Sequence, residues 1–313
     1  MVAMATEAPT SSSEIDADAH DDAATASTDG GVAASIATSA PEVDFSDVDS
    51  AVGEYLIPND ESEMDRLDLQ NHIWRLTLDG RLHFAPLPEL PQRVLDIGTG
   101  TGIWAIEFAQ RYPSAEVIGS DLSPIQPDYV PPNCQFEIDD AEDEWVYGQP
   151  FQYIHGRTLM NCFKDISTIF AKAYDNLSPG GYFEMQDGCL PFRCADGTLE
   201  GTALLEWCTN TLSGSAAVGR TWADPRNYKS IMESVGFVDV TETRLKWPLN
   251  TWPKDPKLKE LGMWVCEDMM QILPAVKRVY TLALGWDVER ADAFIEEAQA
   301  DLKNRRIHAW TDM

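Results

Sequence analysis

The stretch from Arg93 to Glu107 constrains the fold of this chain more than any other part of the sequence. It reads Arg-Val-Leu-Asp-Ile-Gly-Thr-Gly-Thr-Gly-Ile-Trp-Ala-Ile-Glu. The apolar run from Val94 to Ile97 predicts a short buried strand, and the glycines that follow allow a tight turn against which a ligand can lie. From Ile103 onward apolar residues recur at helical spacing, so a helix should begin there with its free N–H groups pointing back at the turn. Strand, turn and helix together predict a nucleotide-binding corner in an α/β, Rossmann-like fold.

Further strands are predicted downstream of this corner, at 114–119, 134–138, 151–155 and 182–186. Because parallel strands place their carboxyl ends at one edge of a sheet, the residues that follow them should gather around the corner. Asp121 lies nineteen residues beyond Gly102, close to the spacing of about 20 at which a carboxylate holds the two hydroxyls of a ribose. Asp140 follows the next strand, where a carboxylate can accept a hydrogen bond from an adenine amino group.

Both NAD and S-adenosylmethionine are compatible with a glycine corner. A dinucleotide site more often shows Gly-x-Gly-x-x-Gly and a second half of the fold for a second nucleotide. Here Asp96 precedes three alternating glycines, and no second nucleotide-binding half follows. An acid in that position suits a cofactor that carries a cationic amino acid group instead of a pyrophosphate. The motif therefore predicts a methyltransferase that uses S-adenosylmethionine. As a separate hypothesis, the methyl group is transferred in line to a nucleophilic oxygen or nitrogen of an acceptor that the motif does not identify.

Candidates for a general base follow from the same sheet edge, since an alcohol or phenol acceptor would benefit from one. His155 ends the fourth predicted strand and Glu184 lies near the end of the fifth, so both are expected at the rim. His72 is a third candidate, on a helix predicted between Asn59 and Leu78. That helix could be a lid over the cofactor, with Tyr55, Gln70 and His72 as contacts, or a helix that only packs on the core.

The composition limits the kinds of partner. A formal net charge of −29 argues against direct binding to nucleic acid, which needs clustered Lys and Arg. Sixteen of the acids precede Arg66, the first Lys or Arg, and residues 1–50 are rich in Ala, Ser, Thr and Asp, so we expect a disordered acidic tail. No secretory or mitochondrial signal and no apolar run of about 20 residues is visible, which favours a cytoplasmic or nuclear protein with no membrane contact. The six cysteines lack metal-binding spacing, so no metal is predicted.

Several longer motifs accompany the corner, namely Tyr55-Leu-Ile-Pro-Asn-Asp-Glu, Gly119-Ser-Asp-Leu-Ser-Pro-Ile-Gln-Pro, Phe136-Glu-Ile-Asp-Asp-Ala-Glu, Pro179-Gly-Gly-Tyr-Phe-Glu and Lys246-Trp-Pro-Leu-Asn-Thr-Trp-Pro. With these motifs the chain, over roughly 55–310, resembles the fungal LaeA-like class I S-adenosylmethionine-dependent methyltransferases. That group includes a regulator of secondary metabolism and enzymes that methylate natural products. The resemblance favours the lid interpretation and implies a seven-stranded sheet whose last strand is antiparallel.

The resemblance also implies a set of cofactor contacts. Gly98 and Gly100 would line the methionine moiety with Asp96 in the same loop, Asp121 would hold the ribose, and Asp140 with Ala141 would hold the adenine. The remaining residues that we expect to contact the cofactor are Thr99, Leu122, His155 and Tyr55.

The expected organisation is a tail at 1–50, a helical lid at 51–90 and a methyltransferase domain at 91–313 with capping insertions at about 188–220 and 255–304. A long strand is predicted at 238–246, and the last strand of the sheet at 306–310. Aromatic and Met residues of the capping segments either pack on the core or line an aromatic acceptor pocket; they are Trp222, Trp247, Trp252, Met263, Trp264, Met269 and Met270.

Three functions remain open at this point. The first is methylation of a small molecule in a natural-product pathway. The second is a LaeA-like regulator that acts in the nucleus through protein partners. The third is a cofactor-binding protein whose chemistry is lost or altered.

Overall fold

A seven-stranded sheet carries the glycine corner in the computed structural model, which describes residues 1–6 and 61–313. The strand order is β4-β3-β2-β5-β6-β1-β8, and β1 is antiparallel to both of its neighbours while the other pairs are parallel. The strands are β1 (Val2–Met4), β2 (Arg93–Ile97), β3 (Glu116–Asp121), β4 (Cys134–Ile138), β5 (Phe151–Arg157), β6 (Leu177–Gln186) and β8 (Val238–Thr241). The predicted fold class is therefore confirmed, with one antiparallel strand in a seven-stranded sheet.

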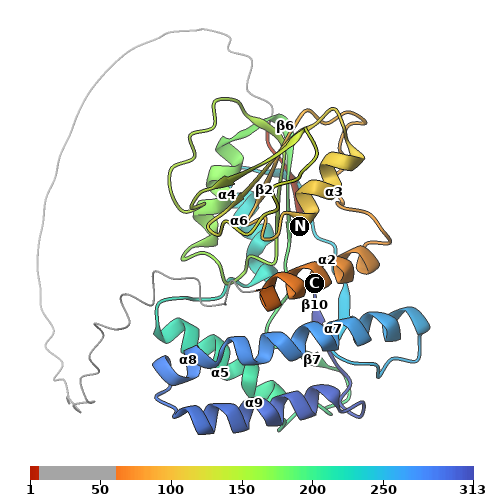
Figure 1. Ribbon diagram of the computed structural model, residues 1–313, viewed down its shortest axis with the longest axis vertical. Helices are drawn as coiled ribbons and strands as arrows, with labels where there is room; N and C mark the ends of the chain where they lie inside the picture. The colour runs from red at the N-terminus through yellow and green to blue at the C-terminus, as the bar shows by residue number, and fades with distance from the viewer. Residues whose placement is uncertain (7–60) are drawn as a thin grey trace, which may run out of the picture.

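Helices cover both faces of this sheet, as Figure 1 shows in its upper half. On one face α3 (Ile103–Arg111) buries Trp104 and Phe108 against Tyr153 of β5. On the other face lie α4 (Ile166–Asp175) and α6 (Tyr228–Val235), the latter preceded by a short 3-10 turn, η1 (Pro225–Asn227). Burial of large aromatic side chains on both faces fixes the sheet firmly beneath the corner. No helix forms between β3 and β4, a segment that contains four prolines.

A helical part packs beside the sheet and has a core of its own, in the lower half of Figure 1. Its helices are α5 (Ala203–Ala217), α7 (Pro256–Ala275), α8 (Lys277–Ala283) and α9 (Val288–Lys303). Asp287 caps α9, because its carboxylate accepts a hydrogen bond from the N–H of Arg290 at 2.7 Å. Helix α2 (Glu61–Thr77) lies between the two parts and contacts both α7 and α3. It is therefore in a position to cover the edge of the sheet.

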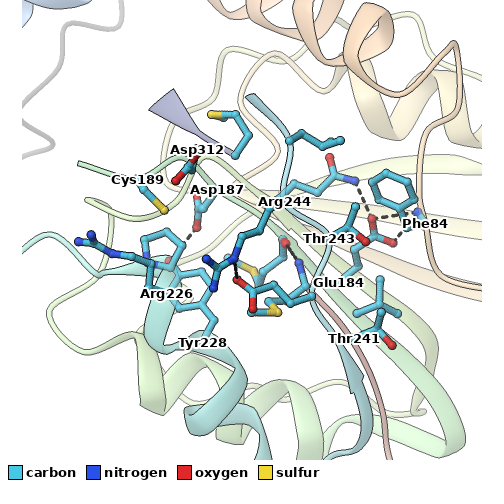
Figure 2. A pocket seen from close by; sticks show the side chains of 18 of the residues that line it. Phe84, Glu184, Asp187, Cys189, Arg226, Tyr228, Thr241, Thr243, Arg244 and Asp312 are labelled. Atoms are coloured by element: carbon cyan, nitrogen blue, oxygen red, sulfur yellow. Dashed lines mark hydrogen bonds and ion pairs between the residues drawn. The ribbon is translucent and has the colours of Figure 1, made fainter. Parts of the chain in front are cut away.

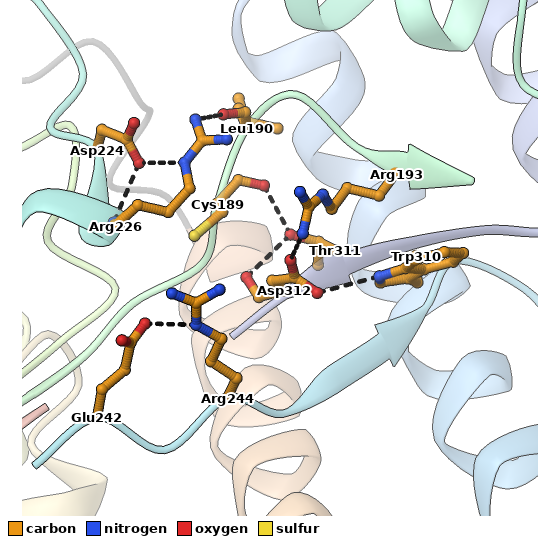
Figure 3. A network of polar contacts seen from close by, with 10 residues as sticks. All are labelled: Cys189, Leu190, Arg193, Asp224, Arg226, Glu242, Arg244, Trp310, Thr311 and Asp312. Atoms are coloured by element: carbon orange, nitrogen blue, oxygen red, sulfur yellow. Dashed lines mark hydrogen bonds and ion pairs between the residues drawn. The ribbon is translucent and has the colours of Figure 1, made fainter. Parts of the chain in front are cut away.

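The last strand of the chain was predicted to belong to the large sheet, and this prediction was wrong. β10 (Ala309–Asp312) belongs to a separate three-stranded sheet with β7 (Arg193–Cys194) and β9 (Lys246–Pro248). Figure 3 shows how side chains anchor it: the Thr311 hydroxyl donates to the carbonyl of Cys189 at 2.8 Å, and Arg193 pairs with Asp312 at 2.6 Å. The predicted long strand at 238–246 is likewise divided, since β8 ends at Thr241 and β9 lies in the small sheet.

The antiparallel position of the large sheet is instead filled from the other end of the chain. Val2–Met4 pairs with β6 on one side and β8 on the other, and Ala3 is fully buried. The expectation of a disordered tail was therefore wrong for the first residues, because composition averaged over fifty residues conceals a strand of three. Residues 7–60, including Tyr55 and most of the expected tail, lie outside the described residues.

Candidate functional site

The glycine corner has the geometry that the sequence predicted. Gly98, Gly100 and Gly102 all adopt positive φ, at 60°, 58° and 78°. A β-carbon at Gly102 would lie 2.2 Å from Cζ of Phe136, so both backbone conformation and space require glycine there. The turn follows β2 directly and opens into α3, whose first N–H groups face back toward the strand end. The turn therefore exposes backbone atoms, without intervening side chains at the glycines, to a ligand that lies above it.

Asp121 lies directly beside this turn, at the end of β3. Its Oδ2 accepts the Gly100 N–H at 2.8 Å, and its Oδ1 accepts the Ser123 N–H at 2.9 Å. Burial raises the pKa of this carboxyl, while the N–H groups of Ser123 and Gly100 act in the opposite direction. Two backbone bonds fix the carboxylate, and each carboxylate oxygen retains capacity to accept another donor.

A cavity of about 320 Å³ runs from this corner into the helical part, a size in the usual range of about 300–1,000 Å³ for small-molecule sites. Its corner side is lined by Gly98, Gly100, Ser120, Asp121, Leu122, Ser123, Asp139, Asp140 and Ala141. Its helical side is lined mainly by apolar and aromatic side chains, among them Leu190, Phe192, Trp207, Trp222, Trp247, Val265, Met269 and Ile272. Six predicted cofactor residues (Gly98, Gly100, Asp121, Leu122, Asp140 and Ala141) thus come together on one wall.

Asp96 and His155 lie below this wall. They are paired in register on β2 and β5, and both side chains are buried. His155 Nδ1 is 2.7 Å from Asp96 Oδ1, and the imidazole stacks on Trp104 with ring centroids 3.8 Å apart. Thr99 donates its hydroxyl to the other Asp96 oxygen at 2.6 Å. His155 was expected at the rim; the structure corrects this, because β5 continues to Arg157 and leaves His155 inside the sheet, where it lines a small cavity together with Gly98 and Arg157.

Glu184 lies outside the large cavity. Its carboxylate accepts the backbone N–H groups of Phe84 and Ala85 at 3.0 and 2.8 Å, as well as the Tyr153 hydroxyl at 3.0 Å. Figure 2 shows it at a separate, smaller cavity, facing Phe84. The Gln186 amide also donates to it, at 2.7 Å. Both oxygens of Glu184 accept hydrogen bonds and its side chain is fully buried. Glu184 therefore links the connector after α2 to β6, and its role is structural and not that of a general base.

The other predicted contacts fall in different places. His72 is exposed and packs edge-on against Trp264, with ring centroids 5.2 Å apart, so it does not line the cavity. Gln70 is buried and does line it, which agrees with the lid interpretation of α2. Of the aromatic and Met residues expected at an acceptor pocket, Trp222, Trp247 and Met269 line the cavity, while Met263 is exposed.

Arg157 is a residue that the sequence reasoning missed. It ends β5 and lines both the large cavity and a smaller one that adjoins it beside Asp96 and Gly98. Its Nη2 donates to the amide oxygen of Asn71 at 2.8 Å, and within residues 1–6 and 61–313 no carboxylate forms an ion pair with it. Burial lowers the pKa of the guanidinium to about 10. A partly buried cation with no ion-pair partner among the described residues suits a ligand that brings a carboxylate.

A second missed group is an ionic cluster on the other side of the cavity. Arg66 donates through Nε and Nη2 to Glu63 at 2.8 and 2.7 Å, and through Nη1 to Asp268 of α7 at 2.8 Å. Burial works to lower the pKa of Arg66, yet the bonds to Glu63 and Asp268 raise it above its ordinary value. The polar positions 63, 66 and 70 repeat at helical spacing, which was the one local signal for this cluster.

Together these features define a class of protein. A glycine turn between β2 and α3, an acid at the end of β3, a second acid after β4 and a partly buried arginine at the end of β5 surround one cavity at the carboxyl edge of a seven-stranded sheet. These residues fit S-adenosylmethionine, because they offer a cradle without side chains, an acceptor for ribose hydroxyls and a cation for a carboxylate. The class is that of the class I methyltransferases.

Comparison with known proteins gives the family. Residues 69–242 match the model of a methyltransferase domain family. The chain is 35% identical over 263 residues to the methyltransferase pytC of Aspergillus terreus, which covers 83% of this chain and 81% of that protein. It is 34% identical over 270 residues to the secondary metabolism regulator LAE1 of Cochliobolus heterostrophus, covering 83% and 88%. The probable methyltransferase tdiE of Emericella nidulans is 33% identical over 250 residues, covering 79% and 78%.

The chain therefore belongs to the fungal LaeA-like family of class I S-adenosylmethionine-dependent methyltransferases. It is a methyltransferase whose cofactor is S-adenosylmethionine. No helix among the described residues is long and apolar enough to cross a membrane.

Proposed function

We propose that this protein transfers a methyl group from S-adenosylmethionine to an oxygen or nitrogen atom of a ring-containing, largely apolar secondary metabolite. The observation that supports this most is the continuity of the cavity, which joins the glycine corner to a chamber lined by Phe192, Trp207 and Trp247. Flat aromatic walls of this kind favour ring systems of matching shape.

The side chains around the corner would divide the work of holding the cofactor. Asp121 would accept both ribose hydroxyls, Asp140 with Ala141 would meet the adenine, and Arg157 would pair with the carboxylate of the methionine moiety. Gly98 and Gly100 would let that moiety approach the backbone. When bound, S-adenosylmethionine supplies a methyl group on a positive sulfur, which is intrinsically reactive toward a nucleophile.

The remaining contribution of the protein would be positioning. Helix α2 as a lid and the helical part as a cap would hold the acceptor in line with the methyl group and exclude water, and orientation of this kind can provide about 7–11 kcal/mol of a barrier. His155 and Glu184 would support the site from below, because both are fully buried and neither lines the large cavity.

A second function deserves a test because relatives that match over most of the chain are secondary metabolism regulators. In that case the protein would act in the nucleus through protein partners, and the site would serve regulation in addition to, or in place of, the synthesis of one compound.

Comparative metabolite mass spectrometry of the fungus with the gene deleted distinguishes these functions. The proposal predicts the loss of one methylated product and accumulation of a precursor lighter by one CH₂ unit, restored by the wild-type gene and not by Asp121→Ala. Loss of several unrelated metabolite families would favour the regulatory function. An unchanged set of methylated metabolites would contradict the proposal.

A further inference from the structure

The inner face of α2 is polar where it meets the large cavity. Glu63, Arg66 and Gln70 are 8%, 5% and 7% exposed and lie on one face of the helix. Asp268 of α7, 2% exposed, meets Arg66 from the opposite side. We call these four residues the lid–cap cluster; all four line the large cavity.

Stability alone does not explain this cluster. Replacing a buried ionic group by apolar residues of similar volume is often neutral or stabilising, because desolvation offsets the attraction between the charges. The neighbours here are apolar, with Val265 and Met269 on the same helix as Asp268. A polar group placed on the wall of an otherwise apolar chamber is the usual means of orienting a ligand.

Gln70 gives the cluster its position relative to the cofactor. It lines the large cavity and also the adjoining smaller one, whose other walls include Asp96, Gly98 and Arg157. Gln70 and Asp268 also interact with each other through their side chains. The cluster therefore reaches from the methionine end of the proposed cofactor site into the aromatic chamber, which is where an accepting atom has to lie.

The composition of the cluster selects the kind of group it can bind. Two carboxylates face one guanidinium, and the donors of that guanidinium are directed at Glu63 and Asp268. What the cluster offers a ligand is therefore acceptor oxygen. Three other cations line the cavity: Arg157 at the cofactor end, Lys164 on the segment after β5, and Arg220 on the segment after α5, beside Trp222.

We propose that Gln70 and Asp268, held in place by Arg66 and Glu63, bind the hydroxyl or N–H donor that the acceptor carries at its accepting atom. The acceptor class is thus an uncharged ring system with a donor, and a carboxylate at that position is disfavoured. Gln70 and Asp268 contact the acceptor directly and orient it for the methyl transfer. This inference rests on the proposed function.

This contact would make the protein bind the substrate more tightly than the methylated product. The bond from sulfur to the methyl carbon breaks, the bond from the acceptor oxygen or nitrogen to that carbon forms, and the acceptor proton leaves to Asp268 or to solvent. A methylated hydroxyl has no donor left, so it loses its bond to the cluster and leaves more readily than the substrate.

The test uses three matched compounds on the complex of the full chain with S-adenosylhomocysteine: 2-naphthol, 2-methoxynaphthalene and 2-naphthoate. Binding is measured by ligand-observed NMR at neutral pH. We expect 2-naphthol to bind roughly fivefold to tenfold more tightly than its methyl ether, the effect of one hydrogen bond, and 2-naphthoate to bind most weakly. In Gln70→Leu and Asp268→Asn this preference for 2-naphthol should shrink to about twofold or less, while the affinity for S-adenosylhomocysteine is retained.

Glu267→Gln is the matched control, because Glu267 neighbours Asp268 on α7 and is exposed. It should keep the full preference. Equal binding of 2-naphthol and its methyl ether to the wild type, or a preference that survives in both cluster variants, would overturn the inference and leave the proposed function intact. Failure of all three naphthalenes to bind a complex that holds S-adenosylhomocysteine would contradict the aromatic acceptor chamber itself, and with it the proposed function.

Discussion

Asp96 and His155 face each other on neighbouring strands, with Asp96 Oδ1 2.7 Å from Nδ1 of the imidazole and both side chains buried. The acid that identified the cofactor in the sequence thus braces the glycine turn from below. Asp96 links β2 to β5 through its contact with His155. Its other oxygen accepts the hydroxyl of Thr99, which fixes the start of the glycine turn. His155 also stacks on Trp104, so these contacts continue from the two strands into α3.

The first prediction concerns the contact between Asp96 and His155. His155→Phe should keep the stack on Trp104 but leave a buried Asp96 oxygen without its donor, at a cost of about 1–3 kcal/mol in the free energy of unfolding. Urea denaturation measures that cost. The double variant with Asp96→Asn should cost less than the two single changes combined, because the pair is coupled. Unchanged stability together with loss of methyl transfer would instead indicate that His155 acts in catalysis.

Arg157 supplies the second prediction. Arg157→Met should weaken binding of S-adenosylhomocysteine by roughly tenfold to a hundredfold, because a charge-assisted bond to the ligand carboxylate is lost. It should leave binding of 5′-deoxy-5′-methylthioadenosine unchanged, since that compound lacks the amino acid group. Titration calorimetry with both ligands gives the comparison. Equal losses for the two ligands would show that Arg157 supports the fold of the site and does not recognise a carboxylate.

Asp187 gives a prediction about pH. It follows β6 and accepts the Leu159 N–H at 2.6 Å and the Tyr228 hydroxyl at 2.8 Å. Burial raises the pKa of Asp187 from 3.8 to about 7, although these hydrogen bonds oppose the rise. The folded state therefore binds the proton more tightly than the unfolded state does. The resulting stability is present below pH 4 and is lost as the pH rises through 7.

In Asp187→Asn this loss should disappear. The difference in free energy of unfolding between wild type and variant, measured in urea at pH 5 and pH 8, should shift in favour of the variant at pH 8. Asp175→Asn, at an exposed position, is the control and should track the wild type at both pH values. A wild-type protein that gains stability over the variant between pH 5 and pH 8 would contradict the assigned direction.

Much of the cofactor side could be predicted because its signals are local. The corner lies within fifteen consecutive residues, and Asp121 and Asp140 each follow a strand that the apolar pattern indicates. The rim was misplaced at β5 because this strand continues two residues past its predicted end, to Arg157, and leaves His155 inside the sheet. The end of β6 at Gln186 was predicted correctly, but Glu184 lies two residues before it, inside the sheet.

The acceptor side could not be predicted in the same way, because its contacts join distant parts of the chain. Arg66 and Asp268 are 202 residues apart in sequence, and their pairing depends on how α2 packs against α7. The antiparallel strand poses the same difficulty. Val2–Met4 carries too few residues to indicate a strand, and its burial between β6 and β8 is decided by the tertiary structure alone.

The most direct measurement of the central claim is titration calorimetry of S-adenosylhomocysteine into wild type, Asp121→Ala and the control Asp128→Ala, whose side chain is exposed and does not line the cavity. If Asp121 holds the ribose of the cofactor, its loss should weaken binding by roughly tenfold to a hundredfold, since two hydroxyls lose a charged acceptor. Asp128→Ala should bind as the wild type does. Equal affinity of all three proteins, or no binding by the wild type, would contradict the account.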